Sequence, residues 1–131
     1  MSQTVEPRGA QGVVLYACSG CSDAGELADR TARTLSQQQL GAMSCLAGIG
    51  GRVKPLIREA QNAEHIVVID GCPLNCAKHT LAQAGFTNVH HLELHRLGER
   101  KGSCPLNEER LARTVAAGAA LIRNLVQTPQ L

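Results

Sequence analysis

Short runs rich in β-branched residues alternate along most of this chain with segments in which apolar residues recur every three or four positions. This alternation restricts the possible folds more than any other feature. Val13–Ala17 is a continuous apolar run, and His65–Ile69, apolar from residue 66 on, is the strongest predicted strand; such runs are typical of strands buried on both faces. Weaker strands are predicted at residues 42–47 and 89–94. Strands that alternate with helices at this spacing predict a parallel sheet with right-handed crossovers and helices on both faces.

The predicted helices have apolar residues at every third or fourth position. They lie near residues 23–41, 53–60, 74–84 and 107–125. Asp23 and Glu26 suggest a capping start for the first helix, and Asn107 is the predicted N-cap of the last. The predicted fold is therefore a single α/β domain over residues 12–131, a three-layer parallel sheet of about four strands that is flavodoxin-like or Rossmann-like, in an order such as 2-1-3-4. Residues 1–11 are predicted to be a flexible lead-in.

Composition argues against several classes of partner. The 131 residues carry a net charge of +2, charged residues make up 18%, and only Tyr16 and Phe86 are aromatic. This balance favours neither nucleic-acid binding nor a polybasic membrane anchor. Apolar runs are too short to span a membrane, and residues 1–11 are polar. We therefore expect a cytoplasmic protein that binds neither nucleic acid nor membranes.

Six cysteines without a secretion signal are the anomaly in this composition, because in a reducing compartment they are better explained as ligands or redox thiols than as disulfides. All six follow predicted strands or lie near strand ends: Cys18 and Cys21 after the first, Cys45 near the end of the second, Cys72 and Cys76 after the third, and Cys104 after the fourth. The carboxyl ends of parallel strands meet at one edge of a sheet. The cysteines are therefore predicted to gather there.

Two of these groups are short chelating pairs, C-x2-C at Cys18 and Cys21 and C-x3-C at Cys72 and Cys76. Thiolates two or three residues apart on a turn can both reach one ion at about 2.3 Å, and two such turns complete a tetrahedron. Helix N-termini after both turns favour the thiolate form. The spacing therefore predicts one metal ion, zinc by ligand type.

Three segments around these cysteines resemble the DGC-domain family of zinc-binding proteins, which is named for an Asp-Gly-Cys tripeptide. They are Cys18–Ser22, Met43–Gly50 and Asp70–Cys76, and the resemblance extends from Val13 through the last helix. It implies a four-cysteine metal site, whose ligands here would be Cys18, Cys21, Cys72 and Cys76. Cys45 lies in a family-like segment and is a fifth candidate.

Other functions remain open at this stage. The same thiolates could hold an iron–sulfur cluster for electron transfer, or Cys18 and Cys21 could perform thiol–disulfide chemistry. An all-cysteine zinc site favours a structural or metal-handling role over catalysis. The residues suggest no acid, base or nucleophile other than thiols, so whether the protein is an enzyme stays undecided.

Several further residues have competing interpretations. Cys45 could pack in the core instead of lying near the metal, and Cys104 is expected to be a spectator. Asp70 is expected to cap the turn that follows it. His91, Glu93 and His95 would share one face of the fourth strand, but a second metal site there is disfavoured because no fourth group converges on them.

Overall fold

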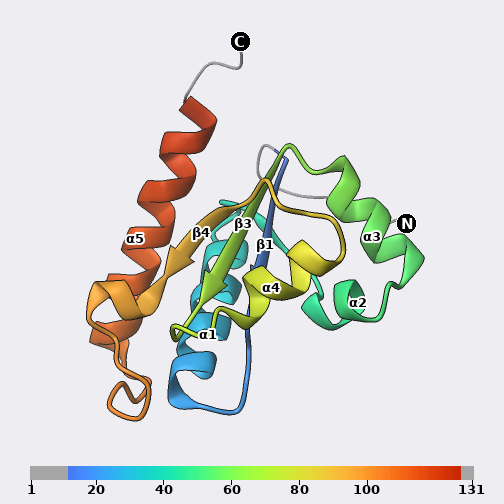
Figure 1. The fold of residues 1–131 in the computed structure, drawn as a ribbon. Coiled ribbons are helices and arrows are strands. Elements are labelled where there is room, and N and C mark those ends of the chain that lie inside the picture. The colour runs from blue at the N-terminus through green and yellow to red at the C-terminus, as the bar shows by residue number, and fades with distance from the viewer. Residues whose placement is uncertain (1–11, 128–131) are drawn as a thin grey trace.

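The computed structural model describes residues 12–127, and the predicted lead-in at 1–11 lies outside this range. A four-stranded, all-parallel sheet forms its centre, with helices on both faces (Figure 1). The elements in chain order are β1 Val13–Ala17, α1 Asp23–Gln37, β2 Ala42–Met43, α2 Leu46–Gly50, α3 Lys54–Asn62, β3 His65–Asp70, α4 Cys76–Gln83, β4 His90–Glu93, the 3-10 turn η1 Leu94–Leu97 and α5 Glu108–Gln127. The predicted fold class is confirmed.

The strands lie in the order β2-β1-β3-β4, which is the predicted order. The central strands β1 and β3 pair over their whole length, from Val13 opposite His65 to Ala17 opposite Ile69. Because both strands are buried on both faces, their apolar runs show no alternation. Their carboxyl ends point to the lower edge in Figure 1, and because β2 and β4 pair with them in parallel, the carboxyl ends of all four strands share this edge.

Two apolar clusters fill the space between the sheet and the helices on its two faces. On one face, Leu15 and Val67 pack with Leu27 of α1 and Ile122 of α5. On the other, Val68 and other buried residues pack with Ile49 of α2, Ala60 of α3 and Leu81 of α4. The two clusters make the three layers of the fold. Among residues 12–127, none of the helices combines the length and apolarity needed to cross a membrane.

The structure departs from the predicted boundaries around β2. The strand ends at Met43 instead of continuing to residue 47, and the residues that follow form the short helix α2. Gly48 lets Leu56 of α3 pack directly against this helix, because a β-carbon at position 48 would lie 1.9 Å from Leu56 Cδ1. Helix α1 also begins differently, since Ser22 is its N-cap and accepts a hydrogen bond from the Gly25 N–H.

Candidate functional site

Cys18 is the first residue after β1, between the ends of the two central strands. Its N–H donates to the carbonyl of Ile69 at 3.1 Å, which extends the pairing with β3. Burial raises the pKa of the Cys18 thiol, and hydrogen bonds to its sulfur from the backbone N–H groups of Gly71 and Gly20 oppose this rise. The Cys18 sulfur therefore lies against the loop that carries the Asp-Gly-Cys tripeptide.

The glycine of that tripeptide is required by close packing. A β-carbon at Gly71 would lie 2.3 Å from the carbonyl oxygen of Ala24, in the first turn of α1. The loop before α1 is packed as closely, because a β-carbon at Gly25 would lie 2.7 Å from the backbone nitrogen of Gly20. Both cysteine-bearing loops are thus held against the first turn of one helix.

Asp70 organises the second cysteine pair. Its buried carboxylate accepts hydrogen bonds from the N–H groups of Ala77 at 2.9 Å and Lys78 at 3.1 Å. This confirms the predicted turn-capping role. Asn75 occupies the N-cap position in the left-handed conformation but makes no side-chain capping bond. Cys76 begins α4 and is exposed, whereas Cys72 is partly exposed.

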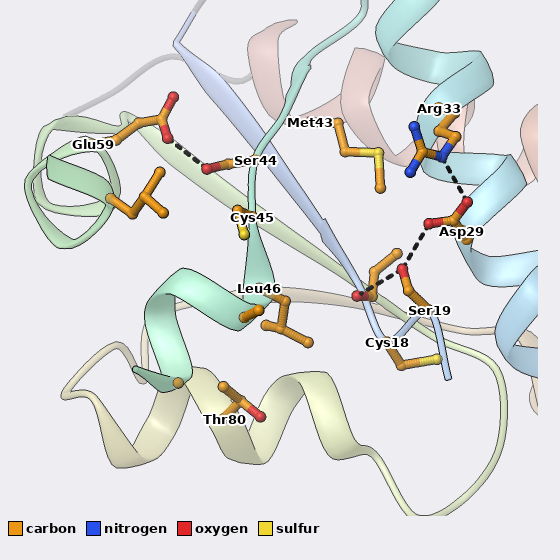
Figure 2. A pocket seen from close by; sticks show the side chains of 14 residues that line it. Cys18, Ser19, Asp29, Arg33, Met43, Ser44, Cys45, Leu46, Glu59 and Thr80 are labelled. Atoms are coloured by element: carbon orange, nitrogen blue, oxygen red, sulfur yellow. Dashed lines mark hydrogen bonds and ion pairs between the residues drawn. The ribbon is translucent and has the colours of Figure 1, made fainter. Parts of the chain in front are cut away.

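Cys45 is placed differently from its prediction. It lies beyond β2 as the N-cap of α2, where its sulfur accepts a hydrogen bond from the Gly48 N–H at 3.3 Å. Its side chain is exposed, so the core-packing alternative is wrong. Figure 2 shows the sulfurs of Cys45 and Cys18 separated across the pocket that both residues line.

This open pocket has a volume of about 930 Å³ and two polar sides (Figure 2). On one side Ser44 donates to Glu59, and on the other Ser19 donates to Asp29 at 2.8 Å. Burial raises the pKa of Asp29, but hydrogen bonds from Arg33 and Ser19 outweigh it and leave that pKa below its ordinary value. The pocket's charged side chains are therefore already paired within the chain.

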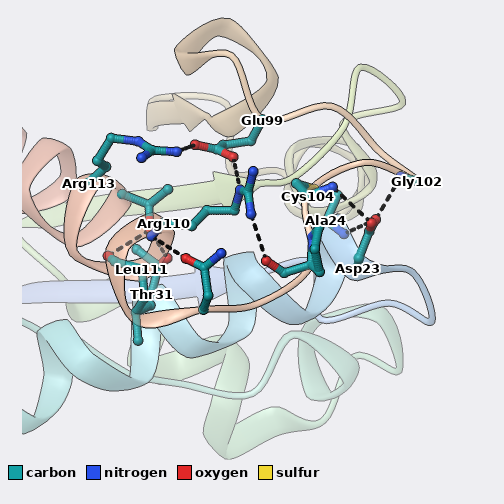
Figure 3. A network of polar contacts seen from close by, with 12 residues as sticks. Asp23, Ala24, Thr31, Glu99, Gly102, Cys104, Arg110, Leu111 and Arg113 are labelled. Atoms are coloured by element: carbon teal, nitrogen blue, oxygen red, sulfur yellow. Dashed lines mark hydrogen bonds and ion pairs between the residues drawn. The ribbon is translucent and has the colours of Figure 1, made fainter.

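Cys104 is fully buried and lies next to the start of α1. Its N–H donates to Asp23 Oδ2 at 3.1 Å, and the Gly102 N–H donates to Asp23 Oδ1 at 2.8 Å (Figure 3). Burial, followed by the charge of Asp23, raises the pKa of the Cys104 thiol to about 11. Asp23 thus fixes the 99–104 loop beside the Cys18–Cys21 loop, a connection that the sequence analysis missed.

The cysteines share one edge, but they do not form a ready-made ligand set. Across residues 12–127, no three His, Cys, Asp or Glu side chains are grouped so that they could hold a metal ion. His91, Glu93 and His95 are likewise not grouped as metal ligands, although His95 Nε2 lies 3.7 Å from Glu93 Oε2. The described residues thus give no support to a second metal site there. The ligand assignments for Cys18, Cys21, Cys72, Cys76 and Cys45 stay predictions.

Together, the fold and these loops define a small parallel α/β protein whose cysteines lie at the carboxyl edge of its sheet. The chain matches the family model described as "DGC domain" over residues 14–117, and it belongs to that family. It is 43% identical over 88 residues to a protein of Pseudomonas aeruginosa named "Anaerobic and virulence modulator AnvM", with 67% of each chain covered. No solved structure matches the chain.

Proposed function

We propose that this protein holds one metal ion, zinc, with thiolates of Cys18, Cys21, Cys72 and Cys76, in a structural or metal-handling role. The observation that carries the proposal is the hydrogen bond from the Cys18 N–H to the carbonyl of Ile69 at 3.1 Å, which joins the start of the Cys18–Cys21 loop to the end of the strand that leads to Cys72 and Cys76. It makes the loops of the two cysteine pairs neighbours. Backbone amides directed at sulfur are also the donors that commonly stabilise metal-bound thiolates.

The donor chemistry fits zinc, whereas the positions of the donors in the described residues do not yet fit it. The proposal therefore requires Cys21 and Cys76 to move toward Cys18 and Cys72 when the ion binds. Both are exposed and lie outside the two apolar clusters, so their displacement would leave the core intact. Cys45 lies apart from both pairs as the N-cap of α2, and we assign it a neighbouring position.

A cytoplasmic location is part of this proposal. All six cysteines are free, although several lie in neighbouring loops. Free thiols in such number suit a reducing compartment.

An oxygen-sensitive centre on the same thiolates is the second candidate. It is favoured by the name of the Pseudomonas aeruginosa relative, which refers to anaerobic modulation. An iron–sulfur cluster would use the four proposed ligands. Thiol–disulfide chemistry would use Cys18 and Cys21, but the raised pKa of Cys18 makes it a poor attacking thiol.

The deciding experiment is elemental analysis of protein purified without added metal, combined with a visible absorption spectrum. We expect about one zinc per chain and no visible absorbance. The Cys72→Ser and Cys76→Ser variants should lose the metal, and Cys104→Ser is the matched control that should retain it. Unchanged metal content in both site variants would refute the proposal, and iron with visible colour would favour the second candidate.

A further inference from the structure

One buried carboxylate closes the loop that carries Cys72 and Cys76. Asp70 directly precedes this loop, and its oxygens accept from the N–H groups of Ala77 and Lys78, which directly follow it. The first turn of α4, and with it Cys76, is therefore held by the position of the Asp70 side chain.

His91 provides the third hydrogen bond to this carboxylate. Its Nε2 lies 2.8 Å from Asp70 Oδ2, and its side chain is only 11% exposed. Because a carboxylate only accepts hydrogen bonds, Nε2 is the donor. In the β3–β4 pairing His91 lies opposite Val68 and Glu93 opposite Asp70, which puts these four side chains on the face of the sheet covered by α4.

The other side of His91 is also constrained. Its Nδ1 lies 3.9 Å from Glu93 Oε1, and that same oxygen forms an ion pair with Arg96 Nε at 2.9 Å. The imidazole thus lies between two carboxylates: it is hydrogen-bonded to Asp70 and lies near Glu93, which is paired with an arginine. The hydrogen bond directs its Nε2–H at Asp70.

We propose that His91 is a positioning residue for the cysteine-bearing turn. Its Nε2–H fixes the Asp70 carboxylate, the carboxylate fixes the first amides of α4, and those amides fix the backbone that presents Cys76. Only the functional consequence of this positioning depends on the proposed function, in which Cys72 and Cys76 bind the metal. The positioning itself can be tested in metal-free protein.

Three variants separate positioning from general packing. His91→Phe keeps a ring but removes the donor, and His91→Gln restores an N–H near the position of Nε2. His79→Phe is the matched control, since His79 is an exposed histidine on α4 itself. If His91→Phe fails to fold, His91→Asn replaces it, because its shorter amide cannot reach Asp70 Oδ2.

Amide hydrogen exchange in metal-free protein is the first measurement. In His91→Phe we expect the Ala77 and Lys78 amides to exchange at least about tenfold faster, with the Val67 and Ile69 amides of β3 unchanged. His91→Gln should restore most of the protection, and His79→Phe should match the parent chain. In zinc competition assays, His91→Phe should weaken zinc binding about tenfold, as loss of an outer hydrogen bond commonly does.

The results that would overturn the inference differ from those that would refute the metal site. Unchanged exchange at Ala77 and Lys78 in His91→Phe, equal acceleration in the β3 core, or no rescue by His91→Gln would each contradict positioning. Unchanged zinc affinity in a variant with accelerated exchange would contradict an effect of His91 on metal binding by the cysteines. Absence of metal binding by the parent chain would refute the proposed function, while the exchange data would still decide the role of His91.

Discussion

Gly71 packs against the carbonyl group of Ala24 so closely that a β-carbon at position 71 would lie 2.3 Å from that oxygen. The contact joins the loop after β3 to the first turn of α1, and thereby brings the two cysteine pairs to one place. The glycine of the Asp-Gly-Cys tripeptide thus has a packing requirement that is independent of any ligand.

Replacement of this glycine should be costly. We expect Gly71→Ala to lower the free energy of unfolding by about 3 kcal/mol, because the added methyl group meets backbone atoms that cannot rotate away. Denaturant unfolding measures the change. Gly20→Ala is the matched control, since no atom lies within 4 Å of its added β-carbon. Equal stability of the two variants would contradict the packing seen here.

The cysteines should differ strongly in reactivity. Cys104 is buried, and its thiol pKa is raised to about 11, whereas Cys21, Cys45 and Cys76 are exposed. At pH 8 we expect alkylation of Cys104 to be at least about 100-fold slower than that of Cys21, because the thiolate is the reactive form. Timed alkylation with mass spectrometry gives each rate. Labelling of Cys104 as fast as Cys21 in folded protein would contradict its burial.

Asp23 should make the stability of the protein sensitive to acid. Hydrogen bonds from the Gly102 and Cys104 amides lower the pKa of Asp23. Its stabilising effect is therefore fully present above the ordinary aspartate pKa of about 3.9 and disappears as pH falls through the lower, folded value. We expect Asp23→Asn to lose less stability than the parent chain between about pH 5 and pH 2.

The measurement for Asp23 is the denaturation midpoint followed against pH. Glu109→Gln is the matched control, because it removes one negative charge at an exposed position in the first turn of α5. Its acid profile should follow that of the parent chain. Identical profiles for Asp23→Asn and the parent chain would exclude Asp23 as the origin of this pH dependence.

Glu99 should be important for attaching the 99–104 loop to α5. Its carboxylate is 2% exposed and accepts from Arg110 Nε at 2.7 Å and Arg113 Nη2 at 3.0 Å (Figure 3). Glu99→Ala leaves the less exposed Arg110 without this partner, so we expect a loss of about 3 kcal/mol in the free energy of unfolding. Arg113→Ala, at the more exposed arginine, should cost less. A larger loss for Arg113→Ala would contradict this order.

Much of this fold could be predicted from local patterns, because the β1 and β3 runs are continuous and apolar and the helical stripes have clear spacing. The short helix α2 could not, since three glycines in its neighbourhood signal a turn, and the helix depends on tertiary packing of Ile49 in the core and of Gly48 against Leu56. This is why Cys45 was expected in a strand. Cys45 is instead the exposed N-cap of α2.

The contacts that organise the site also lie beyond local patterns. Asp23 and Cys104 are separated by 81 positions in the sequence, and Asp70 and His91 by 21. Strand alternation could place His91 and Glu93 on one face, but only the β3–β4 register brings His91 to Asp70. The cysteine pairs were predictable as neighbours because parallel strands end at one edge. Their distances from one another were not.

X-ray absorption spectroscopy of the purified, metal-containing protein tests the central claim most directly. At the zinc edge we predict about four sulfur ligands near 2.3 Å, and loss of that signal in Cys72→Ser and Cys76→Ser but not in Cys104→Ser. A first shell of nitrogen and oxygen without sulfur, or a four-sulfur shell that survives both substitutions, would contradict a thiolate site built from the two cysteine pairs.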